Sequence, residues 1–141
     1  MKSPQFKPVY SAADFESLGF HDCYVYGIRW ISSSYSLIID LDYIVQWLET
    51  NGSYNFWVAP SELRFDYAFE VKISLDWTKL PMDCQVQDVH RRDRKATPNG
   101  NNSYHWEIEF VRPYGSIDLW ATDFRLSLQA TPILSPAQHL R

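Results

Sequence analysis

The chain has 141 residues, which suits one domain, and its 45% hydrophobic and 21% charged residues are typical of a globular protein. Thirteen Lys and Arg against 17 Asp and Glu give a formal net charge of −4, which argues against a dedicated nucleic-acid binder because phosphate contacts need a basic surface. Aromatic residues make up 16% of the chain, a content typical of a β-rich core. We therefore expect one mainly β domain over residues 1–141, of the α+β kind.

One short helix is predicted near the N-terminus, from Ala12 to Leu18. Ser11 can cap this helix, with Asp14 three residues later as a capping-box partner, and Gly19 stands where a left-handed C-terminal residue belongs. A helix of this length is not stable alone, so we expect it to dock on the rest of the domain.

From Cys23 onward, apolar and polar residues alternate with a period of two, which predicts strands with one buried face. The clearest alternation covers 69–77, and the others are 24–30, 37–45, 54–59, 63–67, 104–110, 117–121 and 124–128, with a weaker candidate at 84–90. Pro60 is expected to close the strand before it, and the parity change near Thr122 indicates a bulge or tight turn. About seven or eight strands without helical patterns between them predict a mainly antiparallel sheet, curved or closed as a barrel-like sandwich, over about 23–130.

The only basic run, His90 to Lys95, leads into an irregular stretch that is predicted as a solvated loop over residues 91–102. Contact with phosphate or RNA is the alternative, but no aromatic residues interleave these charges, as stacking on a single strand requires. The tail from Thr131 contains two prolines and is expected to be irregular.

No apolar stretch of signal-peptide length opens the chain, and no segment approaches the roughly 20 apolar residues of a membrane helix. Cys23 and Cys84 are expected to be reduced residues of the core. We therefore expect a cytoplasmic protein with no membrane partner.

Two acidic pairs are the candidates for partner binding. Asp40 and Asp42 share one strand face at a spacing of roughly 7 Å, where they could bind a cation or share a proton in a cleft, or only solubilise the strand. Glu107 and Glu109, beside His105, form a second acidic face. If the strands align these positions, the result is a broad negative surface that favours a basic protein partner.

His21 and Asp22 form a polar pair between the predicted helix and the first strand. A histidine beside a carboxylate can act as a base or hold a metal, but the simpler interpretation is a junction in which Asp22 accepts amide hydrogen bonds. The sequence contains no P-loop, Gly-x-Gly-x-x-Gly, Gly-x-Ser-x-Gly or His-Glu-x-x-His motif, and neither cysteine has a metal-type partner nearby. We therefore predict no enzyme activity and assign no catalytic residue, metal or cofactor.

Five segments resemble a group of small bacterial β-rich proteins with a Phe-His-Asp motif: 20–22 (Phe-His-Asp), the strand 37–44 ending near Trp47, 56–60 (Phe-Trp-Val-Ala-Pro), 63–65 (Leu-Arg-Phe) and 71–75. The resemblance covers most of the chain from Phe20 to Leu126 and implies no catalytic residues. Small acidic proteins of this kind often serve as immunity proteins that neutralise a toxin, so the resemblance implies a toxin-binding role.

Three functions are open. The first is an interaction module, most concretely an immunity-like inhibitor that covers a basic toxin surface with carboxylates and exposed aromatic residues. The second is a small-ligand-binding barrel whose interior includes Trp47, Trp57 and Trp77. The third is a metal-dependent hydrolase that uses His21, Asp22 and the first acidic pair. Exposed sheet edges also leave a homodimer open.

Overall fold

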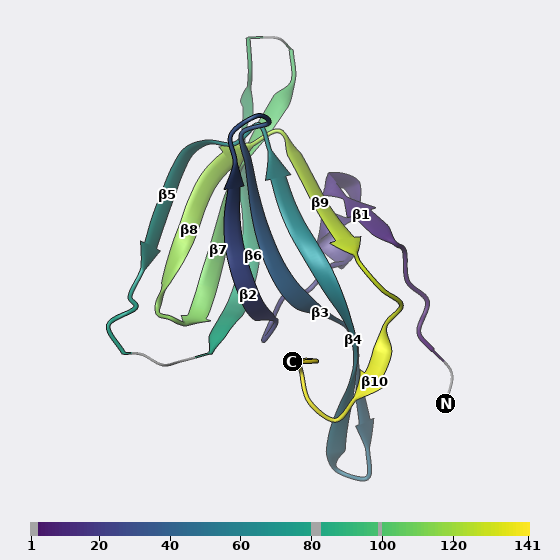
Figure 1. Cartoon of the computed structure of the whole chain (residues 1–141). Helices are drawn as coiled ribbons and strands as arrows, with labels where there is room; N and C mark the ends of the chain where they lie inside the picture. The colour runs from purple at the N-terminus through teal and green to yellow at the C-terminus, as the bar shows by residue number, and fades with distance from the viewer. Residues whose placement is uncertain (1–2, 80–82, 99) are drawn as a thin grey trace.

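The structure is a computed structural model that describes residues 3–79, 83–98 and 100–141. In these residues, ten strands form one antiparallel sheet with the order β1-β9-β4-β3-β2-β6-β7-β8-β5, and β10 pairs with β4 (Figure 1). The strands are β1 (Val9–Ser11), β2 (Tyr24–Ile31), β3 (Ser36–Thr50), β4 (Ser53–Asp66), β5 (Phe69–Leu75), β6 (Cys84–Ala96), β7 (Asn102–Arg112), β8 (Gly115–Ala121), β9 (Asp123–Leu128) and β10 (Ile133–Ser135). The predicted antiparallel, mainly β fold is confirmed. The sheet is open, and the described strands outnumber the seven or eight expected.

The predicted N-terminal helix is a short 3-10 helix, η1 (Ala12–Ser17). The expected bond from the N–H of Ser11 to the Asp14 carboxylate is present at 2.9 Å, and Lys7 Nζ lies 2.7 Å from the same carboxyl group. The next residue, Leu18, has an extended backbone and ends the element. Six residues offer too few backbone hydrogen bonds to sustain an α-helix, so docking decides the conformation.

The strand expected to end at Pro60 instead runs through it. The C=O of Pro60 accepts a hydrogen bond from Gln129 N at 2.7 Å, so the side of β4 where Pro60 lacks an N–H faces the link between β9 and β10. β9 pairs with residues from Ser61 onward, and β10 pairs with 56–58. The proline therefore costs no ladder hydrogen bond, because neither β9 nor β10 pairs with β4 at Pro60 and β3 pairs on the other side.

The basic segment predicted as a loop over 91–102 is mostly strand. β6 reaches Ala96 and β7 begins at Asn102, so only a short connection separates them. Cross-strand pairing explains the strand: Arg91 lies opposite Trp106 on the inner face, and Arg92 lies opposite His105 on the outer face. The predicted irregular tail likewise contains a strand, β10. Both errors arise because local charge and proline content do not reveal which strands lie alongside.

Thr122 separates β8 from β9, as the parity change indicated. The two strands do not pair with each other: β8 lies between β7 and β5, whereas β9 lies between β4 and β1. This single residue therefore links two strands that lie in different parts of the sheet (Figure 1).

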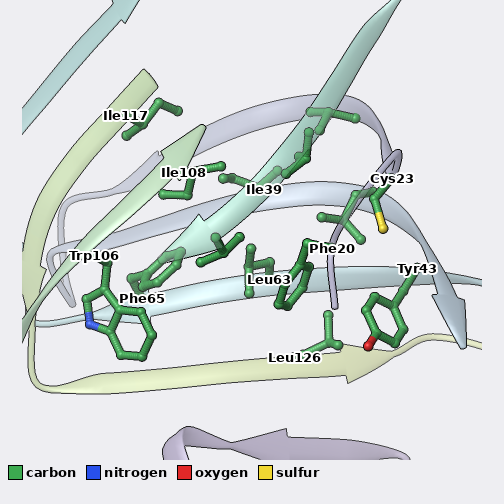
Figure 2. Packing of buried hydrophobic residues seen from close by; sticks show 14 of the residues in the cluster. Phe20, Cys23, Ile39, Tyr43, Leu63, Phe65, Trp106, Ile108, Ile117 and Leu126 are labelled. Atoms are coloured by element: carbon green, nitrogen blue, oxygen red, sulfur yellow. The ribbon is translucent and has the colours of Figure 1, made fainter. Parts of the chain in front are cut away.

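Apolar side chains fill the inner side of the sheet (Figure 2). Trp106 of β7 is fully buried and stacks on Phe124 of β9 with ring centroids 4.9 Å apart, while Phe65 of β4 lies 5.4 Å from Trp106. Phe15 of η1 meets the edge of Trp106 at 5.2 Å, so the short helix does dock on the core. These ring contacts connect β7 with β4 and β9, which are not its neighbours in the sheet.

None of the three tryptophans expected inside a ligand-binding barrel belongs to the core cluster of the described residues. Trp57 is buried, but Trp47 and Trp77 are 41% and 42% exposed.

No helix in the described part of the chain is long and apolar enough to span a bilayer.

Candidate interaction surface

The first acidic pair lies on the outer face of the sheet, and Asp40 is its ion-paired member. Arg29 binds Asp40 with two hydrogen bonds, from Nε to Oδ2 at 2.9 Å and from Nη2 to Oδ1 at 3.0 Å. The same guanidinium reaches Glu62 on β4 at 3.2 Å. Three strands thus share a group in which one guanidinium partly compensates two carboxylates.

Asp42, the other member, is buried, with none of its surface exposed. Its Oδ2 accepts hydrogen bonds from the Tyr26 hydroxyl at 2.6 Å and from the N–H of Leu140 at 2.8 Å. A bulge in β2 between Val25 and Gly27 places the Tyr26 hydroxyl within reach. Burial and this carboxylate raise the pKa of Tyr26. Asp42 therefore does not present its charge to a partner while the C-terminal segment covers it.

The second acidic pair is also compensated. Arg92 on β6 donates a hydrogen bond to Glu107 at 2.7 Å, and His90 Nε2 lies 3.3 Å from Glu109. On the other side of β7, His105 Nε2 lies 3.5 Å from Asp118. Basic and acidic residues from neighbouring strands therefore alternate across this face, and the contacts give no support to a broad, purely acidic surface.

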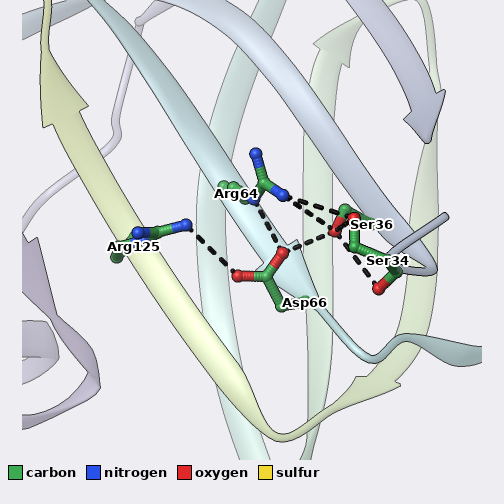
Figure 3. A network of polar contacts seen from close by, with 5 residues as sticks. All are labelled: Ser34, Ser36, Arg64, Asp66 and Arg125. Atoms are coloured by element: carbon green, nitrogen blue, oxygen red, sulfur yellow. Dashed lines mark hydrogen bonds and ion pairs between the residues drawn. The ribbon is translucent and has the colours of Figure 1, made fainter.

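A further charge network covers the end of β4 (Figure 3). Arg64 Nε binds Asp66 at 2.7 Å, and Arg125 of β9 approaches the same carboxylate at 3.4 Å. Ser36 donates a hydrogen bond to Asp66, and Arg64 also reaches Ser34 at 3.3 Å. Partial burial alone raises the pKa of Asp66, but the bonds from Ser36 and Arg64 and the nearby positive charges outweigh it and lower that pKa. This network stabilises the pairing of β3, β4 and β9.

The polar pair forms a junction. His21 Nδ1 lies 3.2 Å from the C=O of Gln87, and the N–H of Asp22 donates to the C=O of Val86 at 2.9 Å. The Asp22 carboxylate lies 3.4 Å from His21 Nε2 and accepts a hydrogen bond from Gln138 at 3.1 Å. These bonds tie the turn before β2 to β6 and to the C-terminal segment.

The hydrolase alternative requires a cluster of metal ligands. In the residues that the structure describes, no group of three or more His, Cys, Asp or Glu side chains could hold a metal ion. Burial raises the pKa of the Cys23 thiol to about 12 and that of Cys84 to about 11, so neither thiol is activated as a ligand or nucleophile at neutral pH.

Sequence reasoning missed an aromatic surface on the hairpin of β3 and β4. The hairpin projects beyond the body of the sheet (Figure 1) and turns at Asn51 and Gly52, whose φ angles of 52° and 78° are those of a two-residue hairpin turn. Trp47 lies opposite Phe56, and Glu49 lies opposite Tyr54, so the four side chains share one face of the hairpin. The Asn-Gly turn between two aromatic runs was the available signal.

We name the side chains Trp47, Tyr54 and Phe56 the aromatic tip. Ring centroids of Trp47 lie 5.0 Å from Phe56 and 6.1 Å from Tyr54, both edge-on, and His21 stacks beside Trp47 at 6.3 Å. Trp47 and Tyr54 nevertheless remain 41% and 52% exposed. A hollow of about 500 Å³ adjoins Trp47 and His21. The three rings thus hold one another in place, with Phe56 buried and Trp47 and Tyr54 facing solvent.

The hairpin is also one-sided in charge. Residues 36 to 63 contain four carboxylates, those of Asp40, Asp42, Glu49 and Glu62, and no Lys or Arg. Glu49 is the exposed carboxylate at the aromatic tip. A surface of aromatic rings with a carboxylate and no cation favours a basic partner.

The sequence matches no protein-family model, and neither a curated protein nor a solved structure shows significant similarity to it.

Proposed function

We propose that the protein is an interaction module that binds a basic surface of a partner protein through the aromatic tip and Glu49. The observation that carries the proposal is the exposure of Trp47 and Tyr54 on a projecting hairpin without a basic residue. Tryptophan and tyrosine supply most of the affinity in many interfaces. Because ring contacts already hold these side chains, binding loses little side-chain entropy.

Charge supports the same kind of partner. The formal net charge of −4 and Glu49 steer a basic protein toward the hairpin. The two acidic pairs contribute less, because Asp42 is covered and the other three carboxylates have basic neighbours. Inhibition of a toxin, as the resemblance implies, is the most concrete form of this proposal.

Site-specific cross-linking in host cells tests the proposal. A photoreactive residue replaces Tyr54 in one variant and Tyr35, an exposed tyrosine before the opposite end of β3, in the control. We expect one partner to be captured at position 54 and not at position 35. Capture of the same proteins at both positions would contradict a specific surface at the hairpin.

The purified partner then allows a quantitative test. The double variant Trp47→Ala/Tyr54→Ala should weaken its binding at least tenfold, since two anchoring rings are lost. Glu49→Lys should lower the association rate and reduce its dependence on salt. Trp30→Ala/Tyr35→Ala, which removes two exposed rings elsewhere, should change the affinity less than twofold. Unchanged affinity of a folded Trp47→Ala/Tyr54→Ala variant would reject the aromatic tip.

A further inference from the structure

The segment Gln138–Arg141, which we name the terminal segment, lies across the outer face at the beginning of β2. After β10 the chain turns back toward this end of the sheet (Figure 1). The Leu140 N–H donates to Asp42 at 2.8 Å, and Gln138 Nε2 donates to Asp22 at 3.1 Å. The segment therefore makes both a main-chain and a side-chain contact with the sheet.

The two basic side chains of the terminal segment, His139 and Arg141, each contact an aromatic ring of β2. The His139 ring lies 4.3 Å from the Tyr24 ring, and the Arg141 guanidinium lies 4.1 Å from the centre of the Tyr26 ring. Among the described residues, Arg141 has no ion pair with a carboxylate. A cation–π contact thus holds this arginine.

The surface around Arg141 is larger than the terminal segment fills. A hollow of about 490 Å³ lies on one side, lined by Tyr24, Trp77 and Asp83 among others. A second hollow of about 280 Å³ adjoins Tyr26, with Asp40 and Glu62 in its lining. Both hollows border Arg141 and both contain carboxylates. Their chemistry, aromatic walls with acidic groups, suits a longer basic segment.

Asp42 supplies the second, independent observation. Its side chain is wholly buried, and Oδ1 has no hydrogen-bond partner within the described part of the chain. A buried carboxylate oxygen without a donor is costly, so its burial at this position calls for an explanation. The terminal segment binds only to Oδ2, which also accepts the Tyr26 hydroxyl, so Asp42 Oδ1 retains the capacity to accept another N–H.

The two hollows beside Arg141, with Tyr26 and Asp42 between β2 and the terminal segment, are called the groove below. We propose that the groove is a binding site for an extended, arginine-containing segment of a partner protein. The terminal segment occupies it as an intramolecular competitor. In the bound state a main-chain N–H of the partner replaces that of Leu140 on Asp42, and its arginine replaces Arg141 on Tyr26. Because the competitor belongs to the same chain, the groove is free in only a fraction of molecules, which lowers the apparent affinity for the partner segment. The inference goes beyond the proposed function, since it uses none of the residues of the aromatic tip.

Calorimetric titration with the acetylated and amidated peptide Ala-Gln-His-Leu-Arg tests the site in the full-length chain. The double variant Leu140→Pro/Arg141→Ala removes the N–H and the guanidinium that hold the terminal segment. We expect this variant to bind the peptide at least tenfold more tightly than the parent chain does. Equal affinity of the two proteins would overturn the competition.

Chemical specificity is tested with a second peptide, in which neutral citrulline replaces the arginine. The released variant should bind the citrulline peptide at least tenfold more weakly, and adding Tyr26→Leu should weaken the arginine peptide similarly, because both changes remove the cation–π contact. If the citrulline peptide binds equally well, the groove does not recognise a cation.

Two controls keep the outcome decisive. If the double variant does not fold, the single variant Arg141→Ala, which changes an exposed side chain, should still bind the peptide at least threefold more tightly than the parent. No gain in that variant would reject the proposal. Trp47→Ala/Tyr54→Ala should leave peptide affinity unchanged, so failure at this groove is distinguishable from failure of the aromatic tip.

Discussion

On the inner face of β7, Trp106 is fully buried against Phe124, whereas on its outer face the neighbouring His105 is partly exposed and pairs with Asp118. The same difference separates Arg91 from Arg92 on β6. Arg91 turns inward and lies over the Phe15, Tyr104 and Trp106 rings, and Arg92 turns outward to Glu107.

The comparison shows how one alternating pattern produces two unlike surfaces. The inner face gains stability from burial and close packing, which depend on shape. The outer face gains little from each exposed ion pair, but its charges must match across strands, because like charges opposite each other destabilise a sheet. Substitutions on the inner face should therefore change stability more than equivalent substitutions on the outer face.

Trp106→Ala should have the largest effect. The change leaves a cavity where the two halves of the sheet meet, and we expect the free energy of unfolding to fall by about 3–5 kcal/mol. Trp30→Ala, at an exposed tryptophan of β2, should change it by less than about 0.5 kcal/mol. Urea denaturation followed by circular dichroism measures both. Similar losses of stability in the two variants would contradict a larger contribution of the inner face.

Arg91 and Arg92 allow the inner and outer faces to be compared with a single residue type. Arg91 donates a hydrogen bond to the C=O of Ala12 at 2.9 Å and contacts three rings, so Arg91→Ala should cost about 1–2 kcal/mol and detach η1. Arg92→Ala should cost less than about 1 kcal/mol, because its partner Glu107 remains partly solvated. Hydrogen exchange at residues 12–17 should accelerate only in the Arg91 variant. Unchanged exchange there would mean that Arg91 does not hold η1.

A pH titration tests the outer face, where we expect the smallest effect. The pKa of Asp66 is lowered in the folded state, so this carboxylate contributes stability above its ordinary pKa of 3.8 and loses that contribution as the pH falls below it. The free energy of unfolding should therefore fall more steeply from pH 5 to pH 3 in the parent chain than in Asp66→Asn. Asp93→Asn, at an exposed carboxylate of β6, serves as the control and should retain the parent slope. Equal slopes for all three proteins would contradict a structural role for the Asp66 network.

Local patterns predicted much of the fold correctly. The alternation in 37–45 and 104–110 corresponds to β3 and β7, and Asn51-Gly52 does turn the chain between two paired strands. These predictions succeeded because period-two alternation and φ-permissive turn residues act over a few neighbouring residues. The pattern did not reveal strand position: the clearest alternation, at 69–77, contains β5 (Phe69–Leu75), which lies at an edge of the sheet.

The candidate residues were found only in part. Asp40 and Asp42 do share a face, but the sequence could not show that Arg29 neutralises one of them and that Leu140 covers the other. Leu140 is 98 positions from Asp42 along the chain, and no local pattern reports a contact at that separation. The aromatic tip was missed for a related reason. Alternation alone does not show whether an aromatic residue of a strand lies in the core or on the surface.

The amino-acid sequence by itself determined that the chain forms antiparallel strands with one apolar face, since this follows from alternation and turn chemistry within short segments. Only the tertiary structure decided which side chains remain exposed and which charges are neutralised. That outcome depends on how far β3 and β4 extend beyond their neighbours, on the strands that lie beside Asp40 and Glu107, and on the return of residues 138–141 across the sheet. Strand order and the path of the terminal segment result from contacts between residues far apart in the chain, which act only after the sheet has assembled.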